Sequence, residues 1–94
     1  MNSLAVRNYR LVIEKEPARS KKRSIYNAYC PALGLADFGN TIDVAIANIT
    51  KLISFHIESL VALGYHVPDE RDATTVITSV SVPVSVSSRK LLHA

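Results

Sequence analysis

Residues 39–64 read GNTIDVAIANITKLISFHIESLVALG, and this stretch decides the fold. Its apolar side chains recur every three or four residues, which predicts one apolar stripe along a helix. The stripe consists of Ile42, Ala45, Ile46, Ile49, Leu52, Ile53, Ile57, Leu60 and Leu63. Asn40 or Thr41 can cap the first turn, and Gly64 can end the helix in a left-handed conformation. Such a helix is about 33 Å long, enough to cover a small sheet.

The sequence before this helix predicts strands. Residues 5–14 and 25–33 show alternating side-chain patterns, and residues 35–38 form a third, shorter candidate. The first two strands should form an antiparallel hairpin around the polar segment 16–24. Pro31 has no amide donor, so the second strand ends near it or lies at an edge.

A fourth strand is predicted after the helix. Valines at even positions alternate there with serines and Pro83 at odd positions, which is typical of a strand with one apolar face. Pro83 indicates an edge or the end of regular pairing. We expect the valine face to join another subunit. This candidate oligomer interface consists of Val80, Val82, Val84 and Val86.

Together these elements predict an α+β fold with the order β-β-β-α-β. The last strand should return parallel to the third by a right-handed connection, giving a mixed sheet. One helix can cover only one face of this sheet, so the other face needs a partner or a polar surface. We expect one domain over residues 1–94, with the fold in 1–88, a tail in 89–94 and no separate DNA-binding domain.

Size and charge narrow the classes of function. A chain of 94 residues has a thin core, so we expect a homo-oligomer, a dimer or tetramer. The net charge of +3 is unevenly distributed: it is +5 over residues 1–23, −4 over residues 24–72 and +2 from Arg89 and Lys90. This pattern favours docking to a charged partner over uniform coating of DNA.

Cys30 is the single cysteine, which excludes an intramolecular disulfide and favours a reducing compartment. The N-terminal sequence has no signal-peptide core, and we find no apolar run of about 18 residues. We therefore expect a cytoplasmic protein without membrane contact. Cys30 could act as a nucleophile with His56 or His66, but its position within a strand favours a small buried side chain.

The sequence does not predict a metal or cofactor site. The three histidines have no ligand spacing with each other or with Cys30. The strand order resembles that of ribonuclease H, which holds two metals on carboxylates. Asp43 and Glu58, however, lie about 22 Å apart along the predicted helix and cannot grip one metal pair. We expect no catalytic residue, metal or cofactor.

The connection between the first two strands is strongly basic. Lys21, Lys22 and Arg23 at this turn, with Arg89 and Lys90, are candidate contacts to nucleic acid or to a protein partner. A solvated turn is the alternative interpretation. No aromatic residue is interleaved with the charges, so they would give affinity without base recognition.

Four motifs in order resemble the HicB family of antitoxins and their stand-alone relatives. They are YNAYCPAL at 26–33, FGNT at 38–41, AIANI at 45–49 and GYHVP at 64–68. The resemblance covers about residues 9–68. Asn40 replaces the usual aspartate, GLA at 34–36 replaces the usual Pro-Gly-Cys, and the basic turn replaces an acidic or glycine-rich one.

The resemblance implies a partial ribonuclease H-like fold without catalytic carboxylates. It also implies a partner, a small basic HicA-like toxin that cleaves mRNA and is blocked by binding. Gly39, Thr41 and Gly64 are interpreted as structural residues, for a close turn, a helix cap and a helix end. The alternative function is a stand-alone nucleic-acid-binding regulatory module that uses the basic turn.

Overall fold

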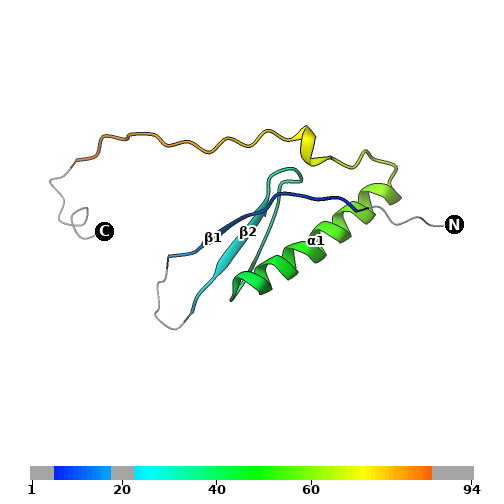
Figure 1. Cartoon of the computed structure of the whole chain (residues 1–94), viewed down its shortest axis with the longest axis horizontal. Helices are drawn as coiled ribbons and strands as arrows, with labels where there is room; N and C mark the ends of the chain where they lie inside the picture. Colours follow the sequence, from blue (N-terminus) through cyan, green and yellow to red (C-terminus); the bar gives the residue numbers. More distant parts are fainter. Residues whose placement is uncertain (1–5, 18–22, 86–94) are drawn as a thin grey trace.

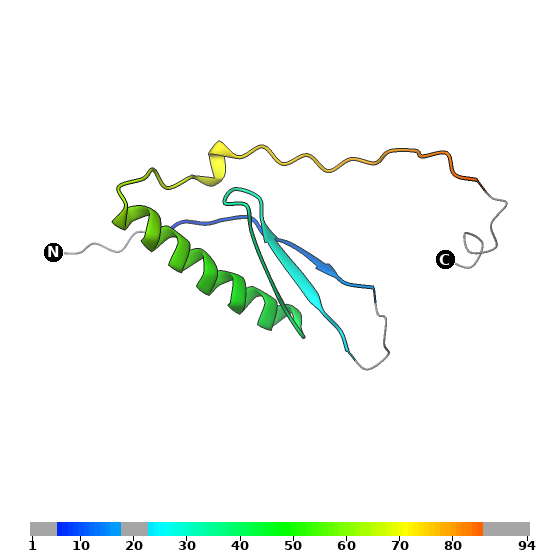
Figure 2. The same ribbon diagram turned by 180° about the vertical axis from the view of Figure 1, so that it is seen from behind.

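The computed structural model describes residues 6–17 and 23–85. Within them a three-stranded antiparallel sheet in the order β1-β2-β3 packs against one long helix, α1 (Figures 1 and 2). The strands are β1 (Val12–Lys15), β2 (Tyr26–Cys30) and β3 (Leu35–Gly39), followed by α1 (Ile42–Ala62) and a short 3-10 helix, η1 (Glu70–Asp72). The α+β class and the order of the first four elements are confirmed.

The β1–β2 and β2–β3 connections hold the three strands in register. Glu16 N donates to Ile25 O at 2.8 Å and continues the β1–β2 hairpin beyond the strands. Pro31 directly follows β2, as expected for a residue that cannot donate to a ladder. Gly34 turns the chain into β3 with a φ of +65°, and its N–H donates to Cys30 O at 2.9 Å. Glycine adopts this left-handed conformation without the strain of a side chain.

Both ends of α1 are capped as the sequence predicts. Thr41 is the N-cap, and its side-chain oxygen accepts from Val44 N at 3.1 Å. At the other end Gly64 has a φ of +75°, its N–H donates to Val61 O, and Tyr65 N donates to Leu60 O at 2.9 Å. This paired arrangement is a Schellman motif, which satisfies the last carbonyls of the helix.

The core is small and lies between β2 and α1. Ala28 and Cys30 from the strand and Ala45 and Ile49 from the helix are fully buried. Partly buried side chains surround these four: Tyr9, Leu11, Ile13, Tyr26, Ala32, Leu33 and Ile53. One helix thus covers one face of the sheet, and the opposite face has no second layer among the described residues (Figures 1 and 2).

The fourth strand is the part of the prediction that is wrong for the described residues. No strand is assigned to residues 73–85, so the sheet is antiparallel rather than mixed, and the ribonuclease H-like order is not completed. The segment is extended, runs alongside the sheet and continues beyond its end (Figures 1 and 2). Alternation gives a segment strand propensity, but a strand also needs an edge to pair with. β1 and β3 are the two edges of the sheet, and residues 73–85 pair with neither of them.

The prediction that no apolar run is long enough to span a membrane is wrong for α1, whose length and apolar composition would allow a crossing. The core helix of a soluble protein meets the same two criteria. Ala45 and Ile49 pack against the sheet, and Asp43, Lys51 and Glu58 interrupt the apolar sequence. Ala45 and Ile49 are the buried residues of α1, whereas Phe55 and Val61 are exposed, so one narrow stripe of the helix packs on the sheet and much of its apolar surface stays open.

Candidate binding surface

The face of the sheet opposite α1 is the first candidate surface. Because β2 alternates and its Ala28 and Cys30 contact α1, its other residues point to the opposite face, and the register extends this face to β1 and β3. The resulting open sheet face consists of Val12, Glu14, Asn27, Tyr29, Ala36 and Phe38. Tyr29 is 45% exposed and Phe38 59%.

The open sheet face is mainly apolar and aromatic. Val12, Tyr29 and Ala36 form one row across the three strands, and Glu14, Asn27 and Phe38 form the next. Aromatic side chains bury a large area at little entropic cost and are enriched at interfaces. Glu14 adds a single carboxylate, and none of the six residues is basic.

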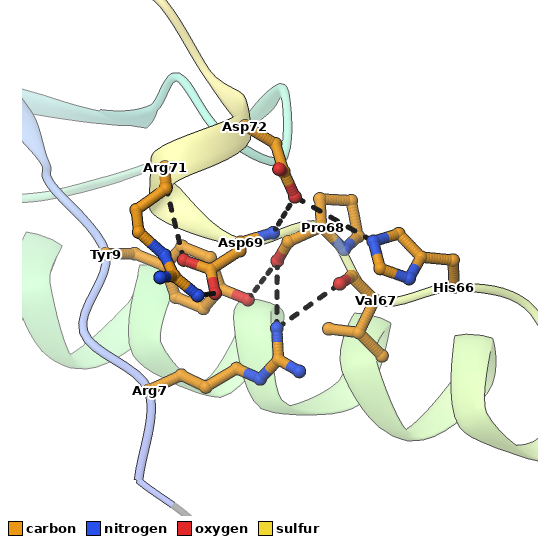
Figure 3. A network of polar contacts seen from close by, with 8 residues as sticks. All are labelled: Arg7, Tyr9, His66, Val67, Pro68, Asp69, Arg71 and Asp72. Atoms are coloured by element: carbon orange, nitrogen blue, oxygen red, sulfur yellow. Dashed lines mark hydrogen bonds and ion pairs between the residues drawn. The ribbon is translucent and has the colours of Figure 1, made fainter.

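A polar anchor holds the segment after α1 against the segment before β1. Tyr9 Oη donates to Pro68 O at 2.6 Å, and Arg7 Nη1 donates to Val67 O at 3.2 Å and to Pro68 O at 3.3 Å (Figure 3). Arg10 adds a backbone donation to Glu70 Oε2 at 3.1 Å and an ion pair with Glu70 Oε1 at 3.4 Å. This anchor fixes where the C-terminal segment leaves the domain.

The anchor is reinforced within η1 itself. Arg71 N donates to Asp69 Oδ1 at 3.2 Å, and Asp69 N donates to Asp72 Oδ2 at 3.0 Å, which forms a capping box (Figure 3). His66 Nε2 lies 3.8 Å from the same Asp72 oxygen. The Arg71 backbone N–H, followed by the Arg71 guanidinium, holds the pKa of Asp69 below its usual value. These groups order the backbone of η1 at the surface.

Cys30 is a core residue, as the sequence predicts. Its side chain is fully buried, and burial raises the pKa of the thiol. A neutral, buried thiol is neither a nucleophile nor a metal ligand. His56, predicted at the margin of the apolar stripe, is half-buried on α1.

The carboxylates and histidines do not gather in the described part of the chain. No group of three or more His, Cys, Asp or Glu side chains there could hold a metal ion. Asp43 lies in the first turn of α1, where a negative charge stabilises the helix dipole. Glu58 is exposed near the opposite end of the same helix.

The structure locates some of the other predicted residues. Arg23 is exposed just before β2, whereas Lys21, Lys22, Arg89 and Lys90 lie outside the described residues, so the basic contact surface stays a prediction. Of the predicted oligomer interface, Val80, Val82 and Val84 are exposed, and Val86 lies outside the described residues. Thr41 caps α1 and Gly64 ends it in a left-handed conformation, as interpreted from the sequence, whereas Gly39 is needed for space, because a Cβ there would meet the backbone of Ala45.

Two features were missed at the sequence level. The placement of Tyr29 and Phe38 on one face, as diagonal neighbours, follows from the alternation of β2 and β3 once their register is known. The Tyr9–Pro68 contact spans 59 residues and has no local signal.

Comparison with known proteins identifies one informative relative. The chain is 42% identical over 64 residues to the UPF0150 protein ssr1765 of Synechocystis sp. (strain ATCC 27184 / PCC 6803 / Kazusa). The match covers 67% of this chain and 75% of the relative. No family model and no solved structure matches the chain.

Proposed function

The chain belongs to the UPF0150 family, and from this membership, its HicB-like motifs and its open sheet face we propose that it is a non-enzymatic antitoxin-type protein. It binds and neutralises a small HicA-like toxin that cleaves mRNA. The observation that supports this proposal best is the open sheet face, because it exposes two aromatic side chains on a sheet.

The aromatic pair supports protein binding over other functions. Tyr29 and Phe38 come from neighbouring strands, and Phe38 is fixed by its backbone: Asn48 Nδ2 from α1 donates to Phe38 O at 2.8 Å. A partner that covers this face would desolvate both rings without rearranging the sheet. Rigid aromatic anchors of this kind supply most of the binding energy at many interfaces.

Charge supports a basic partner. Residues 24–72 carry a net charge of −4, and Glu14 lies on the open sheet face itself. A toxin of the HicA type is basic, as the family resemblance implies. Complementary charge accelerates association and disfavours acidic competitors, and this contribution weakens as salt rises.

Co-expression with the product of the neighbouring reading frame, followed by pull-down, tests the proposal. We expect a complex that restores growth, and we expect Phe38→Asp to reduce capture at least tenfold. Phe55→Asp is the matched control, because Phe55 is a similarly exposed aromatic residue on α1, at 68%. No complex and no rescue of growth would overturn the proposal, as would equal capture by the two variants.

Titration with labelled RNA and duplex DNA at two salt concentrations tests the alternative, a nucleic-acid-binding module that uses the basic turn. Binding through phosphate contacts weakens steeply with salt. We expect no specific binding of either nucleic acid. Tight, salt-sensitive binding without toxin capture would replace the antitoxin proposal with this alternative.

A further inference from the structure

Asn27 lies at the centre of the open sheet face. Its cross-strand neighbours are Glu14 on β1 and Phe38 on β3, and Tyr29 follows it two residues later on the same face of β2. Neighbouring strands are about 4.8 Å apart, and residues i and i+2 of one strand are about 7 Å apart, so these four residues are direct neighbours. All four are exposed. A carboxylate, an amide and two aromatic rings are therefore gathered on one surface.

Glu14 carries the only charge on the open sheet face, because the other five residues are neutral. Every ion pair between described residues involves a residue of η1, so none engages Glu14. Lys15, the next residue, belongs to the opposite face, since its cross-strand partner Tyr26 packs against the core. The charge of Glu14 is thus stabilised by water and not by a cation of this sheet face.

This charge limits what can cover the two rings. A partner that buries Tyr29 and Phe38 also removes water from Glu14, which lies in the same row as Phe38 and diagonal to Tyr29. Burial of an unpaired carboxylate is costly, whereas a cation placed against it compensates the lost hydration. An acidic or purely apolar partner surface is therefore disfavoured, and a basic group opposite Glu14 is required.

Among basic groups, the guanidinium of arginine matches this set of neighbours best. It is planar, donates two parallel hydrogen bonds to a carboxylate and stacks on aromatic rings. A cation–π contact places the cation within about 6 Å of the ring centroid, which is similar to the spacing of the strands. Asn27 Oδ1 can accept a further hydrogen bond. A lysine ammonium is a compact, strongly hydrated charge that offers no flat surface to a ring.

We propose that the open sheet face binds an arginine side chain of a basic protein partner, with Glu14 as the ion-pair acceptor, Asn27 as a hydrogen-bond acceptor and the rings of Tyr29 and Phe38 as the stacking surface. This inference rests on the proposed function, which supplies the basic partner, and adds the residue type that the face recognises. The net charge of −4 over residues 24–72 attracts such a partner to the domain. Glu14 then positions one side chain on the sheet.

Calorimetric titration with the product of the neighbouring reading frame tests the role of Glu14. We expect Glu14→Gln to weaken binding at least tenfold, because it removes the charge and keeps the shape of the side chain. Glu58→Gln is the matched control, since it makes the same change at an exposed position of α1 and should weaken binding less than twofold. A complex of equal affinity with Glu14→Gln and the wild type would overturn this inference and leave the antitoxin proposal standing.

NMR titration with N-acetylarginine amide tests the same surface without the toxin. We expect larger shifts of the Asn27, Tyr29 and Phe38 amide resonances than with equal N-acetyllysine amide, and no such difference in Glu14→Gln. Equal shifts with the two probes, or an unchanged difference in Glu14→Gln, would overturn arginine binding at this face. Arginine-specific shifts without a complex in the calorimetric titration would support arginine binding and overturn the antitoxin proposal.

Discussion

Gly39 at the end of β3 lies against Ala45 of α1 so closely that a Cβ atom on Gly39 would stand 2.5 Å from the Ala45 backbone nitrogen. Both residues are buried. The same Cβ would lie 2.7 Å from a methyl carbon of Val44. This contact limits how closely the helix can approach the sheet. Glycine is required at position 39 because there is no room for a side chain, and not because the backbone needs a left-handed conformation.

Gly39→Ala should therefore destabilise the protein. The added methyl group meets backbone atoms that cannot move without shifting α1, and overpacking of this kind costs about 1–3 kcal/mol. Urea unfolding followed by circular dichroism measures the loss. Ala36→Ser, at an exposed position of the same strand, should change stability by less than about 0.5 kcal/mol. Equal stability of Gly39→Ala and the wild type would contradict the close contact.

Thr41→Ala should weaken the start of α1. The variant leaves the Val44 N–H without its side-chain acceptor, and loss of such a cap costs about 1 kcal/mol. Thr41→Ser should retain most of the stability. Thr50→Ala is a control within the helix, where Thr50 Oγ1 donates to Ile46 O and does not cap an end. A Thr41→Ser variant as unstable as Thr41→Ala would argue against capping.

Tyr9→Phe should loosen the anchor. It removes the part-buried hydrogen bond to Pro68 O, whose net contribution is about 0.5–1.5 kcal/mol. We expect faster amide exchange in residues 69–73 and a small loss of global stability. Tyr65→Phe is the control, because Tyr65 is 63% exposed. Unchanged exchange in the Tyr9 variant would show that the other contacts hold the anchor without it.

Cys30 should react slowly with thiol reagents until the protein unfolds. Burial raises the pKa of the thiol. The contribution of this group to the free energy of unfolding is therefore fully present below the unfolded pKa of about 8.5. This contribution is lost as pH rises through the raised pKa of the folded state. Unfolding between pH 7 and 10 measures it, with Cys30→Ala as the variant that lacks this dependence. Rapid alkylation of the folded protein at pH 8 would contradict burial.

Asp69 should make the capping box of η1 sensitive to acid. Its pKa is lowered, so the stabilisation is present above the usual value of about 3.9 and is lost as pH falls through the lower folded value. NMR spectra of Arg71 and Ala73 should change below about pH 4. Asp69→Asn should remove the contribution of Asp69 titration to this change. An identical acid transition in the variant would assign it to another group.

The sequence predicted the elements up to Gly64 because their signals are local. The period of the apolar residues marked α1, and Thr41 and Gly64 marked its ends through bonds within a few residues. Pro31 ended β2 by lacking a donor. The burial of Cys30 followed from its parity in the strand.

The candidate surface was predictable only in part. Alternation showed that one sheet face would be left without a helix, but placing Tyr29 beside Phe38 required the β2–β3 register. The anchor was not predictable, since Tyr9 and Pro68 lie 59 residues apart and carry no motif.

The sequence by itself determined the strand and helix periods, their caps and the α+β class, because these depend on neighbours along the chain. Only the tertiary structure decided which aromatic residues share the open sheet face and where residues 73–85 go. The valine alternation gave residues 73–85 the propensity of a strand. Whether they become one depends on pairing with an edge strand, and in this structure they pair with neither β1 nor β3.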